Sequence, residues 1–160
     1  MNEEILLDAL YAAIAAIGFA AISRPPRRVY LYCAAIAASG HSLRFILMND
    51  ASAGMHIFTA TLIASLFMGA VGTLLSPLAK TPAEACIFPS LLPMIPGMYA
   101  YKAFGGLALC VLSEDQSDFG YCFYQFAHNG MICIAVLLAM VTGATLPTFI
   151  LKKISFQATR

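Results

Sequence analysis

The stretch Ser90-Leu-Leu-Pro93-Met-Ile-Pro96-Gly97-Met-Tyr99-Ala-Tyr101-Lys102 decides the fold, because it interrupts an apolar run over residues 86–112. Pro93 and Pro96 each lack a backbone donor and clash with the preceding helical turn. Gly97 adds backbone freedom beside them. The pattern therefore predicts two helical pieces, a short one before Pro93 and a longer one from about Gly97.

The composition places the chain in a membrane. Of its 160 residues, 61% are hydrophobic and 11% are charged, and the mean hydropathy is +0.82. A soluble domain is about 45–50% apolar and about one quarter charged, so this chain has too little polar surface to cover a soluble globule. We predict an all-α integral membrane protein. The net charge of +1 gives no indication of nucleic-acid binding.

Five segments have the length of a membrane crossing, which takes roughly 20 apolar residues. They cover residues 5–22, 29–48, 55–75, 86–112 (broken) and 119–150. We expect one membrane domain over residues 1–160. Whether residues 86–92 form a re-entrant half-helix or part of a kinked crossing stays open.

The basic residues predict the orientation, because Lys and Arg favour the cytoplasmic side. With five crossings and the N-terminus outside, the inner segments hold seven of the nine basic residues: Arg24, Arg27, Arg28, Lys80, Lys152, Lys153 and Arg160. We therefore expect the N-terminus outside and the C-terminus inside. Arg44 and Lys102 are left within membrane segments.

Small residues recur at the spacing that lets membrane helices pack closely. The sets are Ala12, Ala16 and Ala20; Ala34 and Ala38; Ala60 and Ala64; and Ser65, Gly69 and Gly72. They predict a packed bundle in lipid. Five helices make a thin bundle for a carrier, so we expect a partner chain or self-association.

Lys102 is a candidate substrate-binding residue because of its depth. It lies ten residues before Leu112, or roughly 15 Å at 1.5 Å per residue, about half of a 30 Å core. It would face a cavity, a partner or a substrate, unless it is paired structurally or lies nearer the surface. Tyr99 shares its helical face and would hydrogen-bond a substrate or simply pack, while Gly106 on that face would leave room.

His41 and Arg44 are three residues apart on the second segment and share a face. Arg44 lies roughly 6 Å from the outer helix end and His41 roughly 12 Å from it. Arg44 either binds a ligand or extends to the surface. His41 is either part of the same site or an interhelical donor.

Together with Lys102 and the positive helix end near Gly97, His41 and Arg44 predict an electropositive site suited to a carboxylate. No Asp or Glu lies deep in the expected helices, so carboxylate-based coupling is not expected within this chain. The sequence contains no metal-ligand cluster, nucleotide loop or catalytic motif. We therefore expect neither a metal nor a cofactor, and no enzymatic activity.

Three motifs carry a resemblance to a known family. They are Pro26-Arg27-Arg28, Gly40-His41-Ser42-Leu43-Arg44, and Leu92-Pro93-Met94-Ile95-Pro96-Gly97 with Ala100-Tyr101 after it. The chain resembles the small (YjjB-type) subunit of the bacterial two-subunit ThrE-type threonine/serine exporter family over nearly its whole length.

The resemblance implies a multi-pass protein of the bacterial cytoplasmic (inner) membrane with a larger ThrE-like companion subunit. It also implies export of small carboxylate metabolites, which are threonine and serine or succinate-like dicarboxylates. His41, Arg44, Pro93, Pro96 and Gly97 carry over as candidate substrate-binding positions. Two other functions stay open, a non-transporting assembly subunit and a homo-oligomeric channel.

Overall fold

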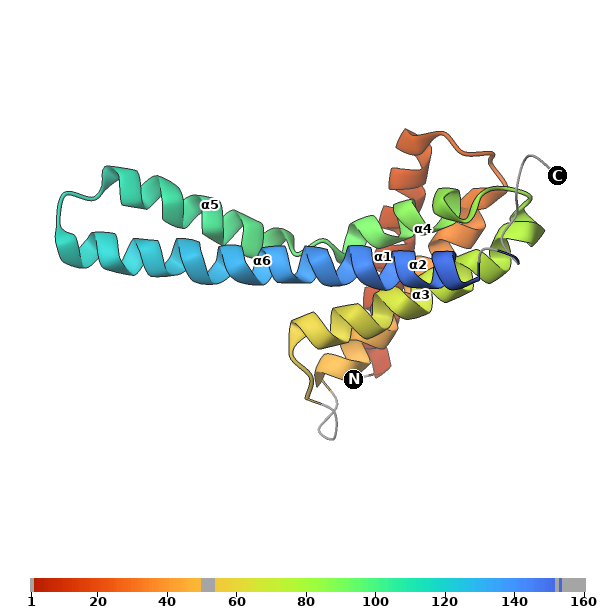
Figure 1. Ribbon diagram of the computed structural model, residues 1–160, viewed down its shortest axis with the longest axis horizontal. Helices are drawn as coiled ribbons and strands as arrows, with labels where there is room; N and C mark the ends of the chain where they lie inside the picture. Colours follow the sequence, from red (N-terminus) through yellow and green to blue (C-terminus); the bar gives the residue numbers. More distant parts are fainter. Residues whose placement is uncertain (1, 50–53, 152, 154–160) are drawn as a thin grey trace. The chain divides into compact units, whose positions relative to one another are not determined.

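The computed structural model describes residues 2–49, 54–151 and 153, and every described element is helical (Figure 1). The elements are α1 (Asn2–Ser23), α2 (Val29–Asn49), α3 (Ile57–Ala79), α4 (Ala83–Leu91), the 3-10 turn η1 (Leu92–Met94), α5 (Gly97–Leu112) and α6 (Gln116–Ile150). Within the described residues, four helices are long and apolar enough to cross a membrane, or five if the helices on either side of the break count as one span. The predicted all-α membrane fold is confirmed, whereas its orientation stays a prediction.

Left-handed residues end two of the helices. Arg24 has a φ of 52° and Lys80 a φ of 50°, and the Lys80 N–H donates to the Pro77 carbonyl at 3.2 Å. Pro77 lies inside the last turn of α3, where it removes one donor without ending the helix at once. For this reason α3 continues to Ala79, past the expected end at residue 75.

The break lies where the prolines predict it. The helical path runs through α4 and η1 to Met94 and restarts as α5 at Gly97. The N–H groups of Tyr99 and Ala100 donate to the Pro96 carbonyl, each at 3.1 Å, and so close the first turn of α5. The predicted interruption at Pro93 and Pro96-Gly97 is confirmed.

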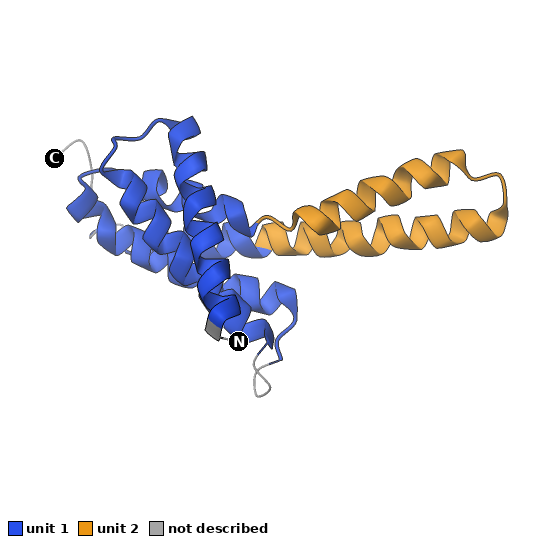
Figure 2. Cartoon of the chain, turned by 180° about the vertical axis from the view of Figure 1, so that it is seen from behind, with its two compact units in different colours: residues 1–94, 139–160 blue, residues 95–138 orange. Residues whose placement is uncertain are grey.

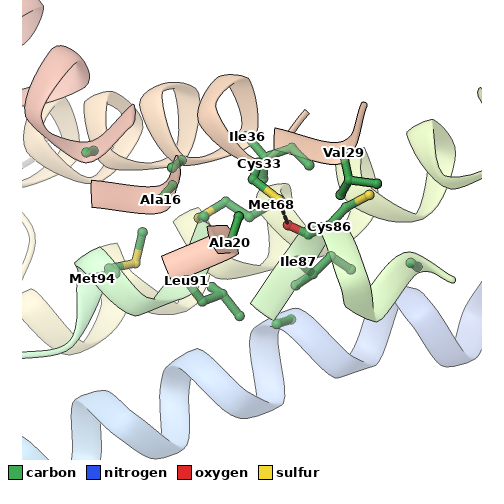
Figure 3. Packing of buried hydrophobic residues seen from close by; sticks show 14 of the residues in the cluster. Ala16, Ala20, Val29, Cys33, Ile36, Met68, Cys86, Ile87, Leu91 and Met94 are labelled. Carbon is green, nitrogen blue, oxygen red and sulfur yellow. Dashed lines mark hydrogen bonds between the residues drawn. The ribbon is translucent and has the colours of Figure 1, made fainter. Parts of the chain in front are cut away.

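The chain divides into two compact units (Figure 2). The first unit comprises residues 1–94 and 139–160 and therefore holds α1–α4, η1 and the C-terminal part of α6. Its core consists largely of small side chains, some of which are shown in Figure 3. Ala12, Ala16 and Ala20 are 3%, 0% and 0% exposed. This alanine stripe on α1 is buried, as its spacing predicts.

The contact between α3 and the C-terminal part of α6 is also close. A Cβ at Gly143 would clash with the Ser65 side chain, and a Cβ at Gly69 would lie 3.0 Å from the Cα of Ala144. The Ser65 hydroxyl donates to the Ala139 carbonyl at 3.1 Å. Small residues therefore let these two backbones approach, as the expected packing requires.

The second unit, residues 95–138, is a hairpin of α5 and the first part of α6. Its helices meet at Gly106, where a Cβ would lie 2.7 Å from the backbone nitrogen of Phe126. A turn away, a Cβ at Gly130 would lie 3.9 Å from the Ala103 Cβ. α6 as a whole has 35 residues, or about 52 Å at 1.5 Å per residue, which exceeds a hydrocarbon core of about 30 Å.

The hairpin offers a matched glycine pair for a test. A methyl group at Gly106 would meet backbone that cannot move aside, whereas Gly105 has open space around it. We expect Gly106→Ala to cost about 1–3 kcal/mol of stability through overpacking. Gly105→Ala should be neutral or stabilising by up to about 1 kcal/mol, since alanine favours helix.

Unfolding of both purified variants in mixed detergent micelles measures this difference in stability. Equal stabilities for Gly106→Ala and Gly105→Ala would contradict the close contact between α5 and α6.

Candidate functional site

Arg44 lies on α2 and bonds to the backbone at the helix break. Its Nη1 donates to the Met94 carbonyl at 2.9 Å, and the side chain is half-buried. Met94 is the last residue of η1, and α5 begins only at Gly97. In an unbroken helix the Met94 carbonyl would accept from the amide four residues later, so Arg44 supplies a donor at the point where the helix is interrupted.

His41, one turn before Arg44, forms a pair with a carboxylate. Its Nδ1 lies 3.0 Å from Oδ2 of Asp8, and the two side chains are 10% and 30% exposed. The other ring nitrogen, Nε2, is buried and has no hydrogen-bond partner in the part of the chain that the structure describes. Since a carboxylate accepts a hydrogen bond from Nδ1–H, Asp8 orients the imidazole with Nε2 as its open end.

Asp8 contributes a carboxylate to the helical bundle, although no Asp or Glu was expected deep in a helix. This residue is inside α1, about 9 Å from the start of the helix at 1.5 Å per residue, and it contacts α2. Its position has a signal in the sequence, because Asp8 lies one turn before Ala12 on the stripe that continues to Ala16 and Ala20. The alanines of the stripe are buried in the core, so Asp8, one turn before them on the same face, also points into the bundle.

Asp8, His41 and Arg44 thus form one cluster with the Met94 carbonyl, built from α1, α2 and η1 of the first unit. Asp8 and Arg44 also interact electrostatically. The cluster therefore contains one cation, one carboxylate and one imidazole. It is less electropositive than the sequence predicts, but the Arg44 guanidinium has donors beyond the one that binds Met94.

The residues of the break have different surroundings. Pro96 is buried and Pro93 is half-buried, whereas Gly97 is exposed. A Cβ at Gly97 would meet nothing within 4 Å, and its φ is not positive. The two prolines interrupt the helix. Gly97 is the first residue of α5, so no side chain covers the N-terminus of that helix.

Lys102 and Tyr99 belong to the second unit. Lys102 is exposed and makes no hydrogen bond or ion pair among residues 2–49, 54–151 and 153, while Tyr99 is half-buried. Gly106 does not leave room beside them, contrary to expectation, because its face packs on α6. Ala103 lies beside Gly130 of α6, so Lys102 is level with the start of the most apolar part of α6. The depth of Lys102 in the membrane and its role as a substrate-binding residue stay predictions.

The structure contains no group of three or more His, Cys, Asp or Glu side chains that could hold a metal ion, within the residues it describes. The cluster around His41 offers a single imidazole and a single carboxylate. Its chemistry is hydrogen bonding and charge pairing with a small polar ligand.

Comparison with known proteins identifies the family of the chain. Residues 8–150 match the family described as Threonine/Serine exporter, ThrE. The chain belongs to the ThrE family. The resemblance carried by the motifs around His41-Arg44 and the helix break is therefore confirmed at the family level. ThrE is a family of exporters and not of enzymes.

A relative from Haemophilus influenzae, described as an uncharacterized protein, is 39% identical over 145 residues. The match covers 90% of this chain and 46% of the relative. The ThrE-family chain thus spans about half the length of the curated relative that it matches. No solved structure matches it.

A double-mutant cycle tests the contact between Asp8 and His41. Asp8→Ala and His41→Ala should each destabilise the protein, because each leaves a half-buried or buried partner unpaired. The double variant should lose less than the sum of the two, with a coupling of about 1.5–3 kcal/mol. Unfolding in mixed micelles measures it, and strictly additive losses would show that the two side chains do not interact.

Proposed function

We propose that the chain is a membrane subunit of a secondary exporter of small carboxylate metabolites, either threonine and serine or a succinate-like dicarboxylate. The observation that carries the proposal is Arg44, a half-buried guanidinium held at the helix break by the Met94 carbonyl. A broken membrane helix with a cation beside it is typical of the substrate sites of transporters. Membership of a threonine/serine exporter family supports the same conclusion.

The guanidinium suits a carboxylate for chemical reasons. Arg has five N–H donors in a planar fork that matches the two oxygens of a carboxylate. One Arg44 nitrogen donates to Met94, so donors remain for a ligand. His41 lies one turn away, and its buried Nε2 has no hydrogen-bond partner among the residues that the structure describes.

A larger ThrE-like subunit completes the exporter in this proposal. The Haemophilus influenzae relative is about twice as long as the part that this chain matches. A protein of this family can therefore contain a second segment of similar length in addition to the matched one. The complex lies in the bacterial inner membrane. The N-terminus lies outside and the C-terminus inside, which puts the basic residues Arg24, Arg27 and Arg28 on the cytoplasmic side.

Two other functions make different predictions. An assembly subunit would leave the whole substrate path in the partner, so removing charges from this chain would not change flux. A homo-oligomeric channel would transport without the partner and would show no counterflow. Arg44 at the break favours the exporter over both.

Efflux of labelled threonine and labelled succinate from cells tests the subunit arrangement. Cells express this chain alone, a larger ThrE-like partner alone, or both. We expect efflux only with both chains, and the solute that leaves identifies the substrate class. Efflux from this chain alone would contradict the two-subunit exporter and favour the channel.

Charge-removing variants test the site within the active complex. Arg44→Ala should lower efflux at least about tenfold, which corresponds to losing about 1.4 kcal/mol or more of interaction with the substrate. Lys102→Ala should have a smaller effect, because Lys102 is exposed and holds no partner within the part of the chain that the structure describes. Arg27→Ala is the matched control, since Arg27 is exposed in the loop after α1.

Efflux is normalised to the amount of each variant in the membrane, so that poor insertion is not mistaken for lost transport. Normal efflux by Arg44→Ala at normal levels would overturn the site assignment.

A further inference from the structure

Two cations occupy backbone positions that usually favour glycine. Arg24 follows α1 with a φ of 52°, and Lys80 follows α3 with a φ of 50°. Among the residues that the structure describes, they are the only non-glycine residues with a positive φ. This left-handed conformation costs free energy for a residue with a Cβ atom, so glycine is the usual residue after a helix. A non-glycine residue in such a position points to a function of its side chain.

The helix dipole alone does not account for these two positions. A cation near the C-terminus of a helix is stabilised by the carbonyl groups there. The last turns of α1 and α3 hold no basic residue, although a Lys or Arg in either turn would gain the same stabilisation without a left-handed backbone. The side chains of Arg24 and Lys80 are exposed, so a ligand outside the helices can reach both.

A direct contact joins the two loops that carry these cations. In the loop between α1 and α2, Nη2 of Arg28 donates to the Lys80 carbonyl at 3.3 Å. That loop has a defined backbone, because the Val29 N–H donates to the Pro26 carbonyl at 2.8 Å. A guanidinium has five N–H donors, so Arg28 keeps donors for a ligand. Arg28 and Lys80 can therefore bind one anion from adjoining loops.

The charges of these loops are almost all positive. Residues 24–28 and 80–82 contain no Asp or Glu, and their cations are Arg24, Arg27, Arg28 and Lys80. Glu84, which is exposed in the first turn of α4, is the nearest carboxylate along the chain. Guanidinium and ammonium groups both bind phosphate oxygens through charge-assisted hydrogen bonds. The loops therefore suit a phosphate group.

Exposed apolar side chains lie next to the left-handed cations. Ile22 is 78% exposed and lies two residues before Arg24, while Leu78 is 68% exposed and lies two residues before Lys80. Both belong to helices that are long and apolar enough to cross a membrane. Such side chains are suited to acyl chains and not to water. A phosphate group that is joined to acyl chains fits the cations and these side chains together, whereas a soluble anion fits only the cations.

We propose that Arg24, Arg28 and Lys80 form a binding site for the headgroup of an anionic membrane phospholipid. The phosphate of the lipid lies between the two loops, and its acyl chains lie along the apolar ends of α1 and α3. Basic side chains at the end of a membrane bundle are typical of such lipid sites. The inference goes beyond the proposed export function, because it requires only that the helices cross a membrane.

Lipid binding to the purified full-length chain in micelles of an uncharged detergent tests the proposal. Radiolabelled phosphatidylglycerol is the anionic probe, and radiolabelled phosphatidylcholine is the probe without net charge. We expect saturable binding of phosphatidylglycerol, at least about tenfold tighter than binding of phosphatidylcholine, because several cations act on one phosphate. Inorganic phosphate is added as a competitor and should not displace the lipid.

Substitutions at Lys80 separate lipid binding from stability. Lys80→Gly should weaken phosphatidylglycerol binding about fivefold, since one cation near a headgroup is removed. In lipid-free micelles the same variant should unfold at the same or a higher temperature, because glycine relieves the left-handed backbone. Lys80→Arg keeps the charge and should keep the binding.

A matched pair of arginines tests whether the contact between the loops matters. Arg28→Ala should weaken phosphatidylglycerol binding about fivefold. Arg27→Ala is the control, because Arg27 is exposed and its side chain forms no hydrogen bond or ion pair within the described part of the chain. It removes the same charge from the same loop and should bind the lipid nearly as well as the wild type.

Four results would overturn the proposal. They are equal binding of the two lipids to the wild type, displacement of phosphatidylglycerol by inorganic phosphate, undiminished binding to Lys80→Gly, and equal losses in Arg27→Ala and Arg28→Ala. The second result would indicate a site for a soluble anion, and the last would indicate diffuse attraction to the basic loops. A lower unfolding temperature of Lys80→Gly would show that the fold itself requires the lysine, and it would also contradict the proposal.

Discussion

The carbonyl group of Met94 is the constraint on which the rest of the site depends. A helix broken within apolar surroundings leaves backbone groups without partners, and each such group is costly there. The structure meets this need with the guanidinium of Arg44, which donates to Met94 at 2.9 Å. The arginine brings a charge that itself needs compensation, and Asp8 on α1 supplies part of it. One break thus requires a cation, and the cation in turn favours a carboxylate nearby.

The alanine stripe on α1 explains how Asp8 reaches this place. Ala12, Ala16 and Ala20 are almost completely buried in the core of the first unit. Their small side chains let the axis of α1 approach the axis of α2 closely. At the head of the stripe, the short Asp8 side chain contacts His41 directly. A larger residue within the stripe would separate α1 from α2 and lengthen the contact between Asp8 and His41. The polar cluster therefore depends on the packing of the small residues.

The second unit has a different surface. Its hairpin is held by Ala103, Gly106 and Cys110 on α5, all of which are buried. The outward faces carry large apolar side chains, including Tyr101 (75% exposed), Phe104 (72%) and Val111 (79%). Such faces are suited to lipid or to another membrane helix, and not to water. An apolar outer surface of this kind agrees with a protein that works within a bilayer.

Much of the architecture could be predicted from the sequence, because hydropathy and proline have strong local effects. The helices, the break at Pro93 and Pro96, and the shared face of His41 and Arg44 follow from spacing alone. Asp8 was missed because a single carboxylate near the start of a helix looks like a surface charge until the partner of that helix is known. The prediction that Gly106 leaves room for a ligand was also wrong. A glycine that leaves room and a glycine that packs against another helix have the same local sequence.

The most direct test of the account is equilibrium binding of labelled threonine and labelled succinate to the purified two-chain complex in lipid nanodiscs. The wild type is compared with Arg44→Ala and with the loop control Arg27→Ala. The account predicts saturable binding of one of the two solutes to the wild type and to Arg27→Ala, and its loss in Arg44→Ala. Undiminished binding to Arg44→Ala would contradict the claim that the cation at the helix break holds the carboxylate.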